Sequence, residues 1–529
     1  MVQLRSLHKS STDHAIKAWM ARTHSVLLLA VLVSACACAA TSEQQTCTAP
    51  DSCTKEKDYN PEAGEWYGEF FPDIPKIKYE GPNSTNPLSF RYYNAEEVVL
   101  GKKMKEWLKF SVAFWHTFKA DGSDPFGSAT KAWPWDKEKD PLQASFKAMH
   151  ANFEFMSKLG VDRWCFHDRD IAPEGATLAE TNKNLDLVAE VALELQKGTS
   201  IKPLWGTAQL FKHPRYMHGA ATSPNATVFA YAAAQVKKAM EVTQLLGGEN
   251  YVFWGGREGY QSLVNTDLEL EMDNLGRFMK MANDFKHSIG FKGTLLLEPK
   301  PQEPTKHQYD WDAATSVAFL HKYGLLEDFK LNIECNHATL AGHSCEHELE
   351  VARINGVLGN IDANTGDAQT GWDTDQFLTD PRMATLVMAV VVKNNGLGSG
   401  GINFDAKIRR ESISTEDLFY GHISGMDALA RGLRNAAALK EAGQLDGLIA
   451  DRYASWKAKG GLGQKIINGK VGFAELEKYA LSNPDPDNPM ASVGFAELEK
   501  YALSNPDPGS SMASAKQELA EIYLDMATK

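Results

Sequence analysis

The sequence lacks several features that mark common functional classes. It has no basic excess, because 55 Lys and Arg residues face 68 Asp and Glu residues, which gives a formal net charge of −13. Without such an excess the chain has little to neutralise phosphates, which argues against a nucleic-acid partner. A G-x-G-x-x-G motif is absent near the first strand-like run, so an external nicotinamide hydride carrier is not indicated. These absences favour a small neutral ligand.

Long hydrophobic runs are also scarce, apart from SVLLLAVLVSACACAA at residues 25–40. Arg22 and His24 precede this run, and its apolar part of about a dozen residues ends in small residues, as in a secretory signal peptide. It is short for a transmembrane span, although the long segment before it leaves an uncleaved anchor open. We expect residues 1–40 to be removed and the chain to enter the secretory pathway (endoplasmic reticulum, vacuole or extracellular space), with membrane attachment only if the run is retained.

Cysteine is rare, with seven residues in 529. Cys36 and Cys38 would leave with the signal peptide, and Cys47 and Cys53 flank TAPDS closely enough to form a small disulfide in an oxidising compartment. The remaining three stand in apolar or strand-end contexts, and we expect them to be buried free thiols: Cys165, Cys335 and Cys345.

The chain does contain short apolar runs bounded by polar or turn residues. There are eight: FSVAFWHTF from Phe110, DRWCFHD from Asp162, IKPLWGTA from Ile201, YVFWGG from Tyr251, TLLLEPK from Thr294, LNIECNH from Leu331, VLGNIDAN from Val357 and GGINFDAK from Gly400. Helix-period segments lie between most of them, such as residues 185–197, 228–246 and 384–394. Strands that alternate with helices in this way predict an α/β fold, a parallel (β/α)8 TIM barrel over residues 110–433, with an open doubly wound sheet as the alternative.

Side chains capable of chemistry favour the barrel, because they recur where the apolar runs end. In a (β/α)8 barrel all carboxyl ends of the strands meet at one face, where such enzymes place their sites. The residues that stand at or just after the ends of the runs are His116, His167, Asp170, Trp254, Glu298, Lys300, Glu334, His337, Asp362 and Asp405.

Two further segments complete the predicted organisation. Residues 41–109 lead into the barrel, and residues 434–529 form a polar, helix-rich C-terminal arm. Inside the arm VGFAELEKYALSNPDP occurs at Val471 and again at Val493, a period of 22 residues. Two copies are fewer than the three that a repeat architecture needs to bury a core, so we assign the repeat little function.

Acidic residues gather at the predicted barrel mouth, with one histidine among them. Like charges brought together raise one another's pKa values and oppose folding unless cations neutralise them. An oxygen-rich set with one imidazole favours two divalent ions, Mg²⁺ first and Mn²⁺ or Co²⁺ next, over a structural zinc. The set is Glu298, Glu334, Asp362, Asp373, Asp375 and Asp405, with His337.

Several long motifs resemble the longer, class II xylose isomerases. They include FHDRDIAPEG from Phe166, WGGREGY from Trp254, NIECNHATLAGHSCEHEL from Asn332 and GNIDANTGDAQTGWDTDQF from Gly359, and the resemblance extends from Tyr79 to the end of the barrel. It implies interconversion of D-xylose and D-xylulose, and more poorly of D-glucose and D-fructose, by metal-assisted ring opening and a 1,2-hydride shift. It also implies a homo-oligomer, a tetramer or a dimer.

The same resemblance assigns roles to individual residues. Glu298, Glu334, Asp362 and Asp405 would hold the first metal, and Glu334, His337, Asp373 and Asp375 the second, with Glu334 bridging. His167, oriented by Asp170, would assist ring opening, and Lys300 would polarise the carbonyl side of the sugar. The remaining residues would wall the pocket: Trp115, Phe126 and Trp254.

Two other functions fit the same residues less well. A metal-dependent phosphodiesterase could use the same barrel and metals, but the acidic balance and Lys300 beside Glu298 argue against it. A sugar-binding protein without catalysis would be expected to lack a metal ligand or Lys300, and none is missing.

Overall fold

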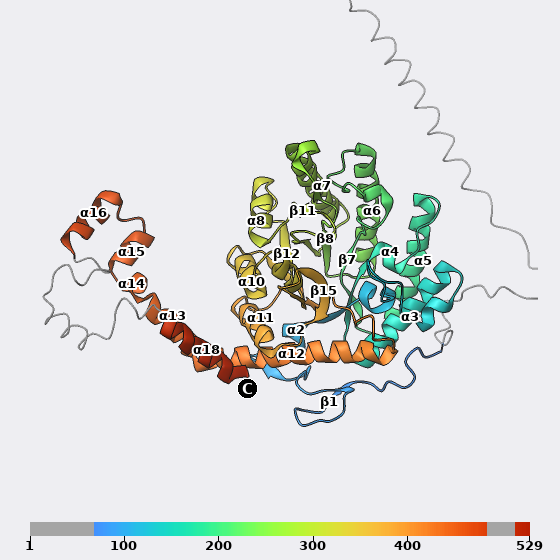
Figure 1. Cartoon of the computed structure of the whole chain (residues 1–529), viewed down its shortest axis with the longest axis horizontal. Helices are drawn as coiled ribbons and strands as arrows, with labels where there is room; N and C mark the ends of the chain where they lie inside the picture. The colour runs from blue at the N-terminus through green and yellow to red at the C-terminus, as the bar shows by residue number, and fades with distance from the viewer. Residues whose placement is uncertain (1–67, 484–513, 529) are drawn as a thin grey trace, which may run out of the picture. The chain divides into compact units, whose positions relative to one another are not determined.

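The computed structural model describes residues 68–483 and 514–528 of the chain (Figure 1). The predicted signal segment, Cys47 and Cys53 lie outside these residues, so those expectations stay predictions. Among the helices of the described residues, none combines the length and the apolar character that a membrane crossing needs.

Eight parallel strands form a closed barrel, and each arises from one of the eight predicted apolar runs (Figure 1). The prediction of a TIM barrel is therefore confirmed, and the open sheet is excluded. In chain order the strands are β5 (Phe110–Ala113), β6 (Arg163–His167), β7 (Lys202–Thr207), β8 (Asn250–Trp254), β10 (Thr294–Glu298), β12 (Phe329–Glu334), β13 (Leu358–Asp362) and β16 (Ile402–Asn403). Neighbours in the barrel follow this order, and β16 pairs with β5 to close it.

Helices follow the strands and enclose the barrel (Figure 1). Their starts are readable from the sequence: Asp140 and Asp380 each cap a helix through a carboxylate oxygen, and each is followed by a proline in the first turn. The main helices are α3 (Pro141–Leu159), α5 (Leu178–Gln196), α6 (Ala226–Leu245), α7 (Leu268–Ser288), α8 (Ala313–Lys322), α9 (Cys335–Leu340), α10 (Cys345–Ile354), α11 (Pro381–Lys393) and α12 (Thr415–Ala442).

Short elements decorate this frame. Two of them matter for the site, because β14 (Asn364–Asp367) and β15 (Trp372–Phe377) pair as an antiparallel hairpin just after β13. The others are β1 (Lys78–Tyr79), β2 (Ser89–Phe90), β3 (Val98–Val99), β4 (Lys102–Lys103), β9 (Gly259–Tyr260), β11 (His307–Gln308), α2 (Met104–Leu108) and α4 (Asp168–Ile171), with short 3₁₀ or π turns at Trp115–Lys119, Pro134–Lys137, Pro214–Tyr216 and Leu263–Asn265.

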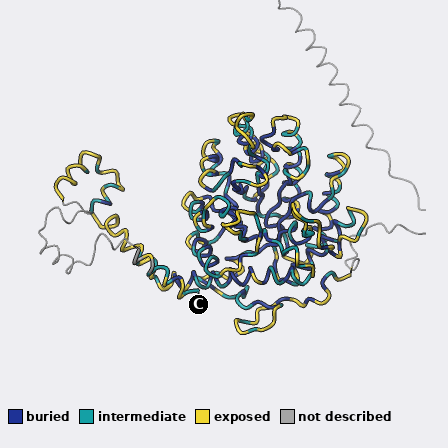
Figure 2. The backbone as a smooth tube through the Cα atoms, viewed as in Figure 1, coloured by how far each residue is buried: buried dark blue, intermediate teal, exposed yellow. Residues whose placement is uncertain are grey.

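The core lies in the barrel and between the barrel and its helices. Figure 2 shows the strands buried and the exposed residues on the outer sides of the helices. Cys165, Leu204, Trp205, Val252 and Leu296 form one cluster inside the barrel, and each is at most 2% exposed. Strands surrounded on both sides read as continuous apolar runs in the sequence, which is why they could be found there.

The C-terminal arm is helical where it is described, as α13 (Gln444–Arg452), α14 (Ala454–Lys457), α15 (Leu462–Ile467), α16 (Phe473–Ser482) and α18 (Ser514–Thr528). The first repeat copy forms α16, and the second lies outside the described residues. α12 continues through the boundary predicted at residue 433. α18 contacts α11, where Arg382 pairs with Glu521 and Asp525.

The structure corrects one expectation for the cysteines. Cys335 and Cys345 were expected to be free thiols, and they form a disulfide with Cα atoms 4.7 Å apart. Cys335 opens α9 and Cys345 opens α10, so the turn between two short helices brings them together, which apolar context alone could not reveal. Cys165 is a buried free thiol, as expected.

Candidate active site

Chemically capable side chains stand at or just after the carboxyl end of the barrel strands. His167, Trp254, Glu298, Glu334 and Asp362 are the last residues of β6, β8, β10, β12 and β13. Trp115 follows β5, and Asp405 stands two residues after β16. The closed barrel therefore brings residues that are almost 300 positions apart in the sequence to one end.

The predicted metal-binding carboxylates form two groups that share Glu334. Glu298, Glu334, Asp362 and Asp405 place one oxygen each within 4.8 Å of one another, and Glu334, Asp373 and Asp375 do the same. Glu298, Glu334 and His337 form a third combination within the same limit. The first group has the residues of the first predicted set, whereas His337 of the second predicted set groups with Glu298 and Glu334 and not with Asp373 and Asp375; Glu334 belongs to all three.

A layer of asparagine amides holds these carboxylates from below. Asn332 Nδ2 donates to Glu298 Oε2 at 2.7 Å and to Asp362 Oδ2 at 2.9 Å, and Asn364 Nδ2 donates to Glu334 Oε1 at 2.7 Å. Residues two apart on a strand share a face, so Asn332 lies beneath Glu334 on β12 as Asn360 does beneath Asp362 on β13. The amides fix the orientation of carboxylates that would otherwise repel one another.

The hairpin β14–β15 supplies Asp373 and Asp375 from outside the barrel wall. Asp375 (φ 45°) and Asp405 (φ 41°) both occupy the left-handed region, which non-glycine residues seldom adopt. Such strain concentrates at functional sites because the surroundings must hold it in place. Lys407 Nζ, 2.8 Å from Asp375 Oδ2, and the backbone N–H of Lys407, which donates to Asp375 O at 2.9 Å, provide that support.

The protonation behaviour of the carboxylates reflects their crowding. Burial and the charge of Asp405 raise the pKa of Glu298 to about 8, and burial together with Asp373 raises that of Asp375 to about 7. Burial and Asp405 likewise raise the pKa of Glu334. Burial would raise the pKa of Asp373 too, but the charge of Lys300 and the interactions with His337 and Asp375 together outweigh it, and the pKa lies well below its usual range. Divalent cations would relieve this repulsion.

The donor set fits such ions. His337 Nδ1 lies 3.0 Å from the Pro299 carbonyl oxygen, to which it donates as a neutral imidazole, so its Nε2 lone pair faces Glu334 Oε2 at 3.1 Å. Burial lowers the pKa of His337, and nearby Lys300 lowers it further, which favours the neutral ring that a metal requires. Carboxylate oxygens with one such nitrogen suit Mg²⁺, Mn²⁺ or Co²⁺.

Lys300 stands two residues beyond the end of β10 and lines the same cavity as Glu298. Lys300 is only 3% exposed. Its ammonium pairs with Asp373 and lies 5.3 Å from the centre of the Trp254 ring. Burial by itself lowers the pKa of Lys300, but Asp373 and Glu334 outweigh that effect and raise it above its ordinary value. Lys300 is therefore expected to stay protonated. It can stabilise negative charge on a bound ligand, but it is a poor acceptor of protons.

His167, which lines the cavity, forms a hydrogen-bonded pair with Asp170. His167 Nδ1 donates to Asp170 Oδ2 at 2.8 Å, and Gln209 Nε2 donates to the other carboxylate oxygen at 3.0 Å. With Nδ1 engaged, the second ring nitrogen is left for the cavity, which His167 lines. This is the arrangement of a proton carrier with a fixed tautomer.

A cavity of about 190 Å³ lies between these groups. It is smaller than the roughly 300–1,000 Å³ of pockets for drug-sized ligands, which suits a molecule the size of a monosaccharide. Its lining combines the charged set with four aromatic residues, Trp115, Trp205, Phe211 and Trp254. Asp362 is fully buried beneath the cavity, and Asp170 stands behind His167.

The structure does not bring Phe126 to this cavity. Its side chain is 85% exposed and stacks on Trp372, whose ring centre is 6.1 Å away. Trp372 precedes Asp373, so Phe126 lies outside the loop that carries a metal ligand. Phe126 is therefore not one of the residues that line the cavity, contrary to its predicted role as a pocket wall.

Several cavity residues escaped the sequence reasoning. His116 was noted at a strand end without a role, and its Nε2 lies 2.8 Å from Asp405 Oδ1, which also accepts from Trp115 Nε1 at 2.8 Å. Phe211 stands four residues beyond Thr207, the last residue of β7, so only its strand-end position could have signalled it. Trp205 and the asparagine layer resemble ordinary core residues in the sequence.

Comparison with known proteins agrees with this site. The chain is 63% identical to a xylose isomerase of Arabidopsis thaliana over 88% of its own length and 92% of the relative's. It is 62% identical to a xylose isomerase of Hordeum vulgare over 88% and 96%, and 58% identical to one of Thermoanaerobacter sp. (strain X514) over 79% and 95%. Residues 449–492 match the family described as the XylA2 C-terminal domain.

These similarities support the isomerase interpretation and neither the phosphodiesterase nor the non-catalytic alternative. They cover between 79% and 88% of the chain, at identities between 58% and 63%. The chain belongs to the xylose isomerase family.

Proposed function

We propose that the protein interconverts D-xylose and D-xylulose, and D-glucose and D-fructose more slowly. The observation that carries this is the convergence of seven predicted ligands at one cavity of sugar size, which Lys300 and His167, the latter paired with Asp170, also line. An aldose–ketose isomerase needs this combination, because it must open a ring, polarise two adjacent oxygens and exclude water.

Two divalent ions, Mg²⁺ first, would be held by the two carboxylate groups that share Glu334. When bound, they would supply Lewis-acid polarisation of the sugar oxygens and offset negative charge on them. The asparagine amides beneath fix the carboxylates in advance, so little reorganisation accompanies binding.

His167 would move a proton to and from a sugar hydroxyl during ring opening. Asp170 holds the ring in one tautomer through Nδ1, and Gln209 holds Asp170 in turn. The aromatic edge of Trp115, 4.5 Å from the imidazole between ring centres, restricts its rotation. The nitrogen that faces the cavity therefore acts from a fixed position.

Lys300 would stabilise charge on the carbonyl oxygen of the open sugar. Because its pKa is raised, it stays protonated and cannot serve as the base of an enediol route. Carboxylates that hold metal ions would not be free to act as that base. Hydrogen would then migrate as hydride between adjacent carbons, behind aromatic walls that keep water away.

An isotope experiment tests this function. Purified protein with Mg²⁺ should convert D-xylose deuterated at C2 to xylulose that keeps the label at C1, and EDTA should abolish turnover. Appearance of the deuterium in water would replace the hydride route by a proton route while leaving the isomerase assignment intact. Absence of xylulose with Mg²⁺, Mn²⁺ and Co²⁺ alike would refute the assignment itself.

We further propose that the protein matures in the secretory pathway. The apolar run at residues 25–40 supports this, and so does the Cys335–Cys345 disulfide, since disulfides persist in oxidising compartments. Mass determination of the secreted chain should place its first residue near position 41.

The same sample should have the mass of a dimer or a tetramer in a light-scattering measurement. The mass of a monomer would contradict the expected oligomer.

A further inference from the structure

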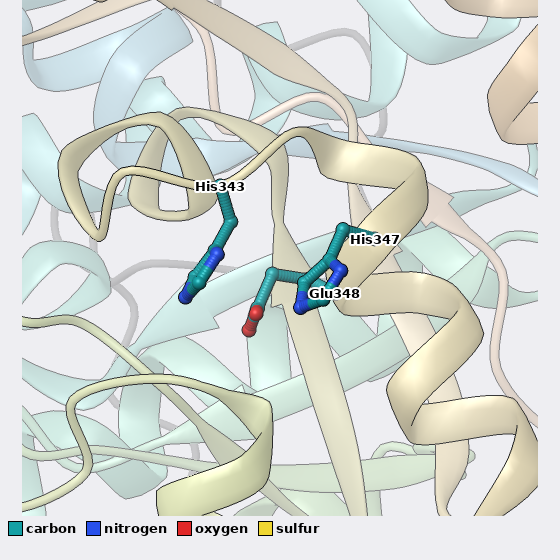
Figure 3. A group of neighbouring side chains, drawn as sticks. All are labelled: His343, His347 and Glu348. Carbon is teal, nitrogen blue, oxygen red and sulfur yellow. The ribbon is translucent and has the colours of Figure 1, made fainter.

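A second group of potential metal ligands lies away from the barrel mouth, at the start of α10. His343, His347 and Glu348 each offer one ligand atom, and these atoms lie within 4.8 Å of one another. Figure 3 shows the carboxylate of Glu348 next to the two imidazole rings. None of the three lines the 190 Å³ cavity. Glu348 does line a small neighbouring pocket of about 10 Å³ together with Glu334 and His337, so the group lies behind the candidate active site and uses other ligand atoms.

Glu348 is the buried member of the group. It is 3% exposed, and its Oε2 accepts a hydrogen bond from the backbone N–H of Ala313 at 2.6 Å. Among the described residues no other hydrogen bond reaches this carboxylate. Its second oxygen, Oε1, is not among the fully enclosed polar atoms that lack a partner, so it is open to a further ligand such as a cation.

The two histidines cover Glu348 from the solvent side. His343 is half-buried and His347 is exposed, and their rings stack with centres 4.6 Å apart and planes inclined by 20°. His343 Nε2 also lies 3.4 Å from Asp312 Oδ2, the N-cap carboxylate of α8. A second carboxylate is thus next to His343, although it is not part of the group whose ligand atoms all lie within 4.8 Å of one another.

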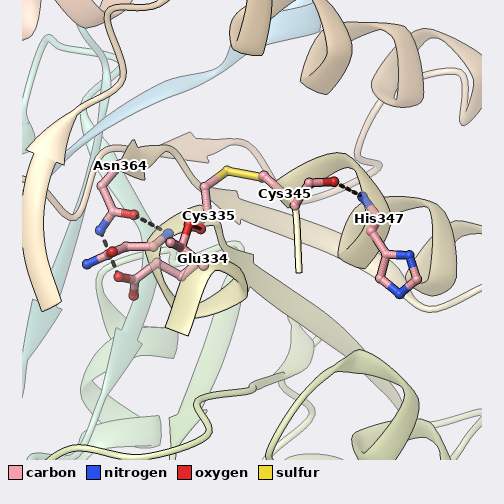
Figure 4. The surroundings of a disulfide bond; sticks show 8 residues. Glu334, Cys335, Cys345, His347 and Asn364 are labelled. Carbon is pink, nitrogen blue, oxygen red and sulfur yellow. Dashed lines mark hydrogen bonds between the residues drawn. A yellow bond between two sulfur atoms is a disulfide. The ribbon is translucent and has the colours of Figure 1, made fainter. Parts of the chain in front are cut away.

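Local structure holds the backbone of this group in place. Cys345 lies between His343 and His347 in the sequence, and its disulfide ties the start of α10 to Cys335 at the start of α9 (Figure 4). The His343 N–H donates to Ala338 O at 2.9 Å, and Ser344 caps α10 through its side chain. Only the imidazoles must turn about their side-chain bonds for both nitrogen lone pairs to face one ion, and their exposure permits it.

We propose that His343, His347 and Glu348, with Asp312 beside them, form a third metal site that takes a transition-metal ion, Zn²⁺ foremost. Two imidazoles with carboxylate oxygens are a ligand set typical of zinc and unlike the oxygen-rich set at the barrel mouth. A bound ion would join the first turn of α10 to the start of α8, because Glu348 belongs to one and Asp312 caps the other. The effect is on stability rather than on the reaction.

Zinc binding to the full chain tests the proposal. The parent and the His343→Ala/His347→Ala variant are first saturated with Mg²⁺, which has little preference for nitrogen ligands, and Zn²⁺ is then titrated by calorimetry. The parent should bind one more Zn²⁺ per chain than the variant, and its melting temperature should rise with Zn²⁺ where that of the variant does not. Equal stoichiometry and equal thermal shifts would overturn the proposal.

Two controls separate this site from other effects. His321→Ala removes an exposed histidine of α8 and should keep the additional Zn²⁺. His347→Ala alone, an exposed change that leaves the folded core untouched, should weaken the additional binding at least about tenfold, the scale of losing one ligand or its support. Mg²⁺-supported isomerase activity should be the same in all variants. A loss of additional Zn²⁺ in His321→Ala as well would contradict the assigned ligands.

Discussion

The barrel mouth and the C-terminal arm contain charged and polar residues in different surroundings. At the mouth, Glu298, Lys300, Glu334 and His337 are all at most 5% exposed and are held by hydrogen bonds and opposite charges. In the arm, α13, α14 and α16 have no buried residue at all. Buried charges interact more strongly with one another and with a bound ligand, because little water is present to screen them. The comparison teaches that function should respond sharply to changes at the mouth and weakly to changes in the arm.

The largest effect is expected from Glu334→Gln. Glu334 stands in both ligand groups, so its loss should disturb the binding of both ions. Turnover should fall at least roughly a thousandfold, on the scale of transition-state charge stabilisation. Much of the thermal stabilisation that Mg²⁺ provides should be lost as well. Activity and melting curves with and without Mg²⁺ measure this. The exposed Glu327→Gln serves as the control. Equal Mg²⁺-induced shifts in parent and Glu334→Gln would refute the shared role.

Lys300→Met should separate catalysis from metal binding. The variant keeps every predicted ligand but loses the cation beside the substrate oxygen, so turnover should fall by about 10²–10³, as for other groups that stabilise developing charge. Metal content by atomic spectroscopy should remain that of the parent. Lys306→Met changes an exposed lysine of the same loop and should have no effect. A loss of metal with the activity would mean that Lys300 acts mainly by holding Asp373.

In the metal-free protein, the crowded carboxylates at the barrel mouth should lower the stability as pH rises. Glu298 titrates near pH 4.5 when unfolded, and burial raises its folded pKa to about 8, so the folded state holds the proton longer. Stability is therefore greatest below about pH 4.5 as far as this group is concerned, and it declines up to about pH 8; Asp375, raised to about 7, adds to the decline. The rise in melting temperature on adding Mg²⁺ should be larger at pH 8 than at pH 6. A smaller gain at pH 8 would contradict the crowding of these carboxylates.

The smallest effect is expected from deleting residues 493–514, the second repeat copy. The first copy, α16, exposes Phe473 to 93% and buries nothing, so one copy should substitute for the other. The isomerase rate should stay within about threefold of the parent, since surface changes cost little stability. Deleting residues 471–492 instead gives the matched control and should behave alike. A collapse of turnover in either folded protein would connect the repeat to the barrel mouth.

The amino-acid sequence by itself determined the fold and most of the chemistry. Buried parallel strands must be short and apolar, so the eight runs and the polar residues at their ends could be read directly. The predicted ligands are the residues that the structure brings together.

Only the tertiary structure decided which residues far apart in the sequence meet. The turn between α9 and α10 joins Cys335 to Cys345, which had each resembled a buried thiol, and groups His343 and His347 over Glu348. It also turns Phe126 away from the cavity and brings Phe211 into it. Apolar context and periodicity report burial but carry no information on the partner across space, because that partner depends on how loops and short helices return to the barrel.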